Sequence, residues 1–167
     1  EGMKDLEVAR IVQESLFPQE ALNLGSYRIF GKSRAMSDIG GDYFDFFPIG
    51  TQRITGLVGD VSGHGVSAAL IMGMAKCAFT SDASHDRGVI ENLDEFNRFM
   101  LKTIKKKKMM TMFFYSLNVE THILNYSNAG HNSPIFWSAA KRTAEFLSME
   151  SFPLGVRQKT VYKMKDL

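Results

Sequence analysis

The sequence predicts an α+β protein in which mainly antiparallel sheets are flanked by helices. An amphipathic helix at the N-terminus is followed by strands, then by two consecutive helices, and then by strands again. The strands follow one another instead of alternating with helices, which favours antiparallel sheets over βαβ units. A chain of 167 residues, 44% of them hydrophobic, is long enough for one domain with a substantial core.

The first part of the chain contains the first helix and a group of strands. Apolar residues from Val8 to Leu16 follow the spacing of one helical face, and Pro18 ends the pattern, so a helix is expected over residues 1–17. Because the chain begins inside this helix without a capping residue, we expect the helix to continue upstream into a linker or another domain. Aromatic and β-branched runs separated by Gly, Pro and Asp then predict three strands: Tyr27–Ser33, Tyr43–Phe47 and Arg53–Val61.

Two helices and a second group of strands follow. A run rich in Ala, Leu and Met predicts a helix over Val66–Thr80, and apolar residues at helical spacing predict another over Val89–Ile104. Cys77 is expected to be a small buried hydrophobe. The remaining strands are expected at Met110–Val119, Ile123–Ser127, Pro134–Trp137, Ala144–Ser148 and Thr160–Met164. Three methionines at the entry to the first of these strands are expected in the core: Met109, Met110 and Met112.

Charge and hydropathy argue against several classes of partner. The net charge is only +2, from 20 basic and 18 acidic residues. The one local excess, Lys105–Lys108, has no interleaved aromatic residues, so we expect a solvated helix end and no nucleic-acid binding. No apolar run approaches the roughly 20 residues that a membrane span needs, and the N-terminus lacks the apolar core of a signal peptide. With one cysteine and therefore no internal disulfide, the expected location is the cytoplasm.

The stretch GDVSGHGVSAAL, residues 59–70, places three glycines, an aspartate, a serine and a histidine before an apolar helix. Its glycine spacing matches neither G-x-G-x-x-G nor G-x-x-x-x-G-K-[ST], and Asp60 would repel a phosphate, which argues against a nucleotide cradle. Ser62 misses the G-x-S-x-G position by one residue, which argues against a serine nucleophile. What remains is a carboxylate at a strand end, followed by glycines that let backbone carbonyls approach a bound group.

A second group of carboxylates lies in SDIGGDYFDFF, just before the neighbouring strand. It contains Asp38, Asp42 and Asp45, and a hairpin between the two strands would bring Asp42 near Asp60. Hard cations such as Mg²⁺ and Mn²⁺ take carboxylate oxygens, backbone carbonyls and water, so a divalent metal site is one interpretation. The other is that both segments are Asp–Gly turns, in which the aspartate accepts backbone hydrogen bonds. The residues alone leave both open.

Six motifs together resemble a known family: ARIVQESLFP, DIGGDYFDFF, GDVSGHGVSAAL, MMTMFF, NAGHNSPIF and FPLGV. Their order and approximate spacing, over residues 8–156, resemble the SpoIIE/RsbU branch of the PPM metal-dependent serine/threonine phosphatases. The resemblance implies an α-β-β-α sandwich of two mainly antiparallel sheets flanked by helices, with a bimetal centre at one edge. It also implies two Mn²⁺ or Mg²⁺ ions, and hydrolysis of phosphoserine or phosphothreonine on a partner protein.

The resemblance also assigns roles to three residues. By motif match, Asp42 corresponds to the family's GGD aspartate, Asp60 to its metal-bridging aspartate, and Val61 to the residue whose backbone carbonyl completes a metal shell. Asp42 and Asp60 are thus the expected catalytic residues, and Val61 joins them as the third metal ligand. Two ions about 3.5–4 Å apart can bridge and deprotonate a water and neutralise the phosphoryl oxygens during in-line attack.

The chain departs from the family pattern at its C-terminal end. The family carries two further aspartates, one of them in a TDG motif, that complete the metal shells. This chain ends at Leu167, and Asp166 lacks the following glycine, so Asp166 is not accepted as a substitute. We therefore expect a domain that is incomplete at the C-terminal end, with poor metal affinity and weak or absent catalysis.

The chain contains four histidines, at positions 64, 85, 122 and 131. His64 lies four residues after Asp60, whereas the eukaryotic branch of the superfamily has a general-acid histidine two residues after its bridging aspartate. A structural role in the loop is expected for His64, with catalysis as the alternative. His131, in NAGHN, is expected to brace the loop near the active-site edge, with direct substrate contact as the alternative. His85 and His122 are expected in exposed loops.

These observations predict a linker or switch helix over residues 1–18 and a PPM-type phosphatase domain, without its C-terminal part, over residues 19–167. The implied substrate is a phosphorylated regulatory protein, such as an anti-sigma-factor antagonist, in a bacterial signalling or sigma-factor-regulating pathway. The N-terminal helix is expected to connect to an upstream sensor domain, and its apolar stripe to mediate self-association, giving a homodimer. The alternative is a catalytically inactive phosphatase-like module that binds a phosphoprotein or dimerises.

Overall fold

The computed structural model describes residues 2–34, 39–83 and 87–167, which form three helices and nine strands. The helices are α1 (Gly2–Leu16), α2 (Val66–Ala83) and α3 (Val89–Thr103). The strands are β1 (Leu22–Leu24), β2 (Tyr27–Ile29), β3 (Asp42–Ile49), β4 (Arg53–Val61), β5 (Met110–Asn118), β6 (Leu124–Ala129), β7 (Ile135–Ser138), β8 (Thr143–Phe146) and β9 (Lys165–Asp166). All three helices are confirmed, and β4 has the predicted bounds.

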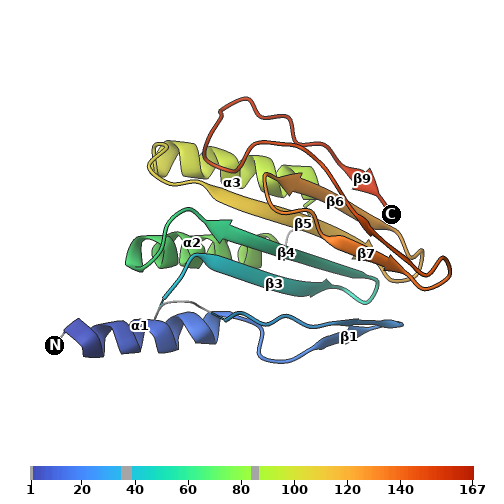
Figure 1. The fold of residues 1–167 in the computed structure, drawn as a ribbon, viewed down its shortest axis with the longest axis horizontal. Helices are drawn as coiled ribbons and strands as arrows, with labels where there is room; N and C mark the ends of the chain where they lie inside the picture. The colour runs from blue at the N-terminus through green and yellow to red at the C-terminus, as the bar shows by residue number, and fades with distance from the viewer. Residues whose placement is uncertain (1, 35–38, 84–86) are drawn as a thin grey trace.

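Five strands form the central sheet, in the order β3-β4-β5-β6-β9, and every neighbouring pair is antiparallel (Figure 1). The predicted hairpin is the β3–β4 pair, whose register runs from Asp42 opposite Asp60 to Ile49 opposite Arg53. Two smaller antiparallel sheets, β1–β2 and β7–β8, complete the sheets of the described residues. The α+β class and the antiparallel sheets are thus confirmed.

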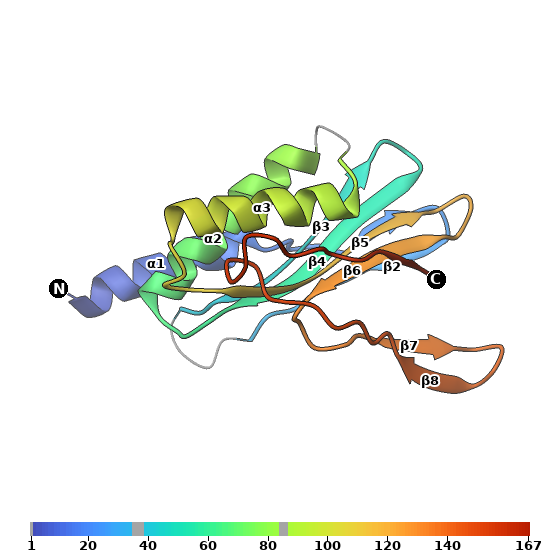
Figure 2. The same cartoon turned by 90° about the horizontal axis from the view of Figure 1, so that it is seen from above.

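Helices α2 and α3 cover one face of the central sheet, while the β7–β8 hairpin projects on the other side (Figure 2). Successive side chains of a strand point to opposite faces, so alternate residues of β4 and β5 reach the helices. Leu57 and Val61 of β4 and Phe114 of β5 belong to this core, packed against helix residues such as Met72. The apolar spacing that predicted α3 is therefore the pattern that buries it against the sheet, whereas α2 was predicted from its composition.

The opposite face of the sheet carries a smaller apolar cluster at the end away from Asp42 and Asp60. Ile54, Leu117 and Val119 are its buried members. The β1–β2 hairpin packs against them through partly buried residues that include Leu24 and Ile29. The remaining part of this face, toward Asp42, carries the half-buried Phe44 and the exposed Val58.

Two predictions about the strands are wrong, and one strand was not predicted. Residues 160–164 form no strand, because Tyr162 packs into the core beside the helices and pairing begins only at β9, opposite Asn125 and Tyr126. The strand predicted over Tyr27–Ser33 ends at Ile29, and its partner β1 was not predicted because three residues are too few for a clear alternation.

Two predictions about buried residues are also wrong. Cys77 is exposed, because α2 turns Ala75 and Phe79 toward the sheet and Cys77 away from it. Met109 is 42% exposed, because it lies in the turn before β5, whereas Met110 and Met112 are fully buried as expected. The predictions for Asp38 and His85 lie outside the described residues. No helix in the described part of the chain is long and apolar enough to cross a membrane.

Candidate functional site

Asp42 and Asp60 lie directly opposite each other at one end of the β3–β4 pair. Directly opposed residues of an antiparallel pair point to the same face, with Cβ atoms about 5 Å apart. Both residues are exposed, and neither carboxylate has a hydrogen-bond or ion-pair partner within the three described ranges. The hairpin thus brings two unpaired like charges together at one edge of the sheet.

The electrostatics of the pair are consistent with a cation site. Partial burial, and then the charge of Asp42, raise the pKa of the Asp60 carboxyl above its ordinary value, while His131 opposes the shift. A second negative charge at this distance disfavours ionisation of the Asp60 carboxyl. A bound divalent cation would remove this repulsion, because it is the largest local charge in such a site.

Gly41 allows the backbone of the GGD loop to approach the end of β4. The Val61 N–H donates to the Gly41 carbonyl at 3.1 Å. A Cβ atom on Gly41 would lie 2.6 Å from the Val61 carbonyl oxygen, which is closer than real Cβ contacts. Glycine is therefore required here, and the Val61 carbonyl lies beside Gly41 at the same edge as the two aspartates.

The loop after Asp60 is held by the residues that precede β5. The Ser62 N–H donates to the Met109 carbonyl at 2.9 Å, and the Met109 N–H donates to Ser62 Oγ at 3.0 Å. Lys108 Nζ donates to the Ser62 carbonyl at 2.9 Å. Gly63, with a φ of 83°, then turns the chain toward α2. Lys108 is therefore half-buried and clamps the loop, so the prediction of a solvated lysine run is wrong at this position.

The NAGHN loop reaches the same edge from β6. Asn128 is fully buried, and its side-chain amide bonds the backbone of His131 twice: Oδ1 accepts from the His131 N–H at 2.6 Å, and Nδ2 donates to the His131 carbonyl at 2.9 Å. His131 Nδ1 lies 2.8 Å from Thr111 Oγ1, and Thr111 is the register partner of Asp60 on β5. His131 is thus fixed next to the carboxylate pair.

The FPLG motif packs behind this edge. Met110 and Leu154 form an isolated bridge with reciprocal backbone hydrogen bonds of 3.1 and 2.8 Å. The Gly155 N–H donates to Asn97 Oδ1 at 2.8 Å, which ties the same segment to α3. These contacts explain why motifs far apart in the sequence converge on the start of β5.

The other predicted site residues fall in different places. Asp45 points to the helix face, where it is buried and accepts hydrogen bonds from Tyr43 Oη at 2.6 Å and Lys76 Nζ at 2.5 Å. It therefore cannot join the carboxylate pair. His64 is exposed and lines a cavity of about 540 Å³ together with Asp42 and Asp60. His122 is exposed as expected and lies 2.8 Å from the Tyr27 hydroxyl.

Gln13 is a residue of this region that the sequence did not indicate. From α1, its Nε2 donates to the Gly40 carbonyl at 2.7 Å, and its Oε1 accepts from the Gly40 N–H at 3.1 Å. Gly40 lies two residues before Asp42, so one side chain connects the first helix to the candidate site. The only signal in the sequence was a polar residue beside the apolar stripe of the helix.

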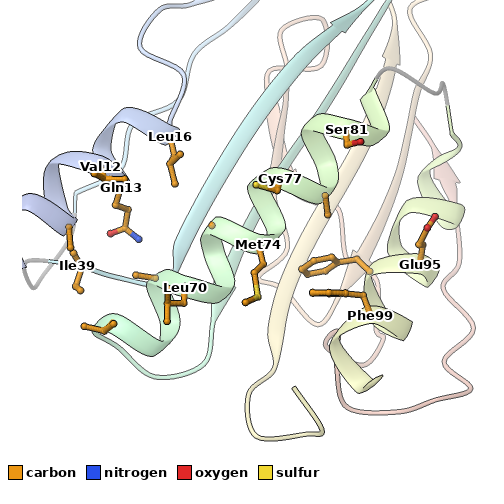
Figure 3. A pocket seen from close by; sticks show the side chains of 16 residues that line it. Val12, Gln13, Leu16, Ile39, Leu70, Met74, Cys77, Ser81, Glu95 and Phe99 are labelled. Carbon is orange, nitrogen blue, oxygen red and sulfur yellow. The ribbon is translucent and has the colours of Figure 1, made fainter. Parts of the chain in front are cut away.

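An apolar groove of about 920 Å³ separates α1 from α2 and α3 (Figure 3). Val12 and Leu16 line it from α1, Leu70 and Met74 from α2, and Phe99 from α3. Cys77 also faces this groove, which accounts for its exposure. Val8, Ile11 and Val12 expose more than half of their surface, so the predicted stripe of α1 is largely uncovered within the chain.

The oxygen ligands available at the carboxylate edge suit a hard divalent cation, although they are few. Two exposed carboxylates and a nearby backbone carbonyl are oxygen ligands, which Mg²⁺ and Mn²⁺ prefer. Among the residues that the structure describes, no group of three or more His, Cys, Asp or Glu side chains converges as a metal site. The chain therefore offers a partial set of ligands that water or further groups would complete.

Comparisons with solved structures agree with the fold. Among solved structures, the PP2C domain of SiaA from Pseudomonas aeruginosa superposes with a TM-score of 0.72 at 16% identity, over 98% of this chain and 65% of that one. The RsbU and RsbW domains of Rv1364c from Mycobacterium tuberculosis superpose with a TM-score of 0.67 at 30% identity, over 79% of this chain and 37% of that one. The first likeness supports the fold alone.

Sequence relatives point to the same family. The phosphoserine phosphatase RsbU of Bacillus subtilis is 31% identical over 97% of this chain and 48% of its own length. The phosphoserine phosphatase RsbP of the same organism is 23% identical over 98% of this chain and 41% of its own length. The chain therefore spans about half the length of these curated relatives. The family model for stage II sporulation protein E (SpoIIE) matches residues 50–167. The chain therefore belongs to the SpoIIE family, as an RsbU-type phosphatase domain of the PPM superfamily.

Proposed function

We propose that the chain is a metal-dependent phosphoprotein phosphatase that hydrolyses phosphoserine or phosphothreonine on a regulatory partner protein. The observation that carries this proposal is the pair of unpaired carboxylates, Asp42 and Asp60, opposed at one edge of the sheet. The names of RsbU and RsbP as phosphoserine phosphatases support the reaction class. The structure of the relative RsbX in complex with magnesium supports a divalent cofactor.

In this proposal Asp42 and Asp60 are the catalytic residues, and Val61 adds its carbonyl to their metal ligands. Bound Mn²⁺ or Mg²⁺ ions, two in a complete site, would lower the pKa of a water and neutralise phosphoryl charge. The role of the chain is to fix the oxygen ligands. The β3–β4 register sets the relative position of the two carboxylates. Gly41 allows the Val61 carbonyl to come close, and Lys108 holds the loop that follows Asp60.

We further propose that residues 1–18 act as a linker or switch helix and residues 19–167 as the phosphatase domain. The helix would connect to an upstream sensor domain and pair with a second copy of the chain. Two features support this: the exposed stripe of Val8, Ile11 and Val12, and the apolar groove beside it. The hydrogen bonds from Gln13 to Gly40 would transmit a change in the helix to the GGD loop.

Family membership also supports a proposal for the substrate class. We propose a phosphorylated regulator of a partner-switching system, such as an anti-sigma-factor antagonist. The joint presence of RsbU and RsbW domains in the solved Rv1364c structure supports a substrate of this kind. A panel of phosphorylated candidate antagonist proteins, compared with phosphoserine peptides of scrambled sequence, tests the choice of partner.

Hydrolysis assays test the catalytic proposal. The full-length protein is given p-nitrophenyl phosphate or a phosphoserine peptide with Mn²⁺, and is compared with Asp60→Asn and with the exposed control Asp166→Asn. We expect Asp60→Asn and a chelator each to abolish turnover, while Asp166→Asn leaves it unchanged. Equal turnover by Asp60→Asn, or turnover in excess chelator, would show that the metal site is not the catalyst.

A second candidate function rests on the small number of ligands. Because no cluster of three acidic, histidine or cysteine ligands is found in the described ranges, a binding module without turnover is the alternative. Such a module would bind a phosphoprotein, or dimerise, without hydrolysis. Tight binding of the phosphorylated regulator with no phosphate release in saturating Mn²⁺ would favour this alternative.

A further inference from the structure

Two hydrogen bonds hold the backbone of His131 at the carboxylate edge. Both hydrogen bonds to its backbone come from the side-chain amide of Asn128, which is fully buried. A buried side-chain amide needs hydrogen-bond partners for its donors and acceptors. The Asn128 amide finds them in the backbone N–H and carbonyl of His131, and thereby fixes that backbone. The position of His131 is therefore determined by the core of the protein.

The orientation of the His131 ring is set separately, by Thr111. Two polar atoms lie near the threonine hydroxyl: His131 Nδ1 at 2.8 Å and the Asp60 carbonyl at 3.4 Å. An O–H···O hydrogen bond of 3.4 Å is weak, so the hydroxyl proton makes its stronger bond when it is donated to Nδ1. A neutral imidazole that accepts at Nδ1 carries its proton on Nε2, so the ring presents an N–H donor on the edge away from Thr111.

This Nε2–H group has no hydrogen-bond partner in the described parts of the chain. His131 is half-buried, and it lines a cavity of about 380 Å³ together with Asp42. Desolvation lowers the pKa of the His131 imidazole below its ordinary value, although Asp60 and Asp42 oppose this shift. The ring is close enough to both carboxylates to sense their charge, and it bonds to neither.

We propose that His131 is a substrate-contacting residue, whose Nε2–H donates a hydrogen bond to a phosphoryl oxygen of the phosphoprotein bound at the Asp42–Asp60 edge. Thr111 and Asn128 are its positioning residues: one fixes the ring and the other fixes the backbone. This inference rests on the proposed phosphatase function and extends it by naming a protein donor to the phosphoryl group. An N–H donor suits the site, because the two aspartates can only accept hydrogen bonds when ionised.

Two substitutions separate substrate contact from bracing of the loop. In His131→Asn, the shorter amide can reach Thr111 from about the position of Nδ1 but cannot replace Nε2. In His131→Gln, the longer amide can place an N–H group near the position of Nε2. A bracing role predicts rescue by asparagine, whereas a substrate-contacting role predicts partial rescue by glutamine. Thr111→Val, with Thr111→Ser as its matched control, tests the orienting hydroxyl in the same way.

The experiment measures binding of inorganic phosphate to the Mg²⁺-loaded full-length protein, by calorimetry and by ¹⁵N NMR of the histidine rings. We expect a proton on Nε2 of His131 in the wild type, and a shift of that nitrogen on saturation with phosphate. We also expect phosphate affinity to fall about tenfold in His131→Asn and Thr111→Val, as for loss of a hydrogen bond to a charged group. His131→Gln and Thr111→Ser should recover most of it.

Two outcomes would overturn the proposal. Phosphate binding that leaves the His131 ring unchanged would show that the ring does not contact the ligand. Equal phosphate affinity in His131→Asn and the wild type would show that bracing is its whole role. The wild-type NMR measurement does not depend on the folding of any variant. In both of these cases hydrolysis by the wild type would persist, whereas loss of both phosphate binding and hydrolysis would instead contradict the proposed function itself.

Discussion

The side-chain amide of Gln13 bonds both backbone groups of Gly40, so one residue of α1 holds the loop that leads into Asp42. Replacing Gln13 by alanine removes both hydrogen bonds, and we expect the free energy of unfolding to fall by about 1–2 kcal/mol. Mn²⁺ affinity should also fall several-fold, because the GGD loop loses its anchor. Calorimetric titration with Mn²⁺ and urea denaturation measure the two effects.

The control for Gln13 is Glu7→Ala, an exposed position on the same helix. This change should leave both the stability and the Mn²⁺ affinity near wild type. If Gln13→Ala lowers stability but leaves the Mn²⁺ affinity unchanged, the helix does not communicate with the site through this residue.

Gly41 and Gly40 form a natural matched pair for testing the approach of Val61. A methyl group on Gly41 would meet the Val61 carbonyl at 2.6 Å, whereas one on Gly40 would meet nothing within 4 Å. Gly41→Ala should therefore separate the GGD loop from β4, destabilise the protein by about 1–3 kcal/mol and weaken Mn²⁺ binding. Thermal denaturation with and without Mn²⁺ measures this. Equal behaviour of the two variants would refute the close approach.

Lys108 clamps the loop after Asp60, whereas Lys106 is exposed. Lys108→Met should lower the free energy of unfolding by about 1–2 kcal/mol, because the carbonyl of Ser62 loses a charged donor. Lys106→Met is the control and should have little effect. Hydrogen exchange of the loop amides would detect the change locally, and unaltered protection of residues 62–65 in Lys108→Met would argue against the clamp.

Asp45 and Lys76 connect β3 to α2 through an ion pair whose carboxylate is buried and whose ammonium is partly exposed. Tyr43 donates a further hydrogen bond to the carboxylate. Lys76→Met leaves the Asp45 carboxylate buried without its cation, and we expect a loss of about 3 kcal/mol in urea denaturation. The double variant Asp45→Asn/Lys76→Met should recover part of this loss, because the uncompensated charge is removed. A double variant less stable than Lys76→Met would contradict this account of the pair.

The regular elements of this fold could be predicted because their patterns are local. The bounds of β4 follow from a β-branched run between turn residues, and the β3–β4 hairpin that opposes Asp42 to Asp60 follows from the short turn between the strands. Cys77 was misplaced because the apolar run of α2 does not show which side faces the sheet. The strand predicted near residue 162 failed because Tyr162 packs into the core instead of pairing.

The contacts that hold the site could not be predicted, because they join residues far apart in the sequence. Gln13 and Gly40 are 27 residues apart, and Lys108 and Ser62 are 46 apart. A polar residue in a helix and a lysine before a strand can each point into solvent in many ways. Local composition therefore favoured an exposed position for both side chains. Only the tertiary fold brings a free backbone group next to each side chain.

Mn²⁺ titration of the full-length protein and of Asp60→Asn, by calorimetry, tests the central claim most directly. The account predicts that the wild type binds Mn²⁺ and that Asp60→Asn loses at least about tenfold in affinity, because one of two opposed carboxylates is gone. Asp166→Asn should bind as the wild type does. Equal Mn²⁺ affinity in the wild type and Asp60→Asn would show that the carboxylate pair is not a metal site.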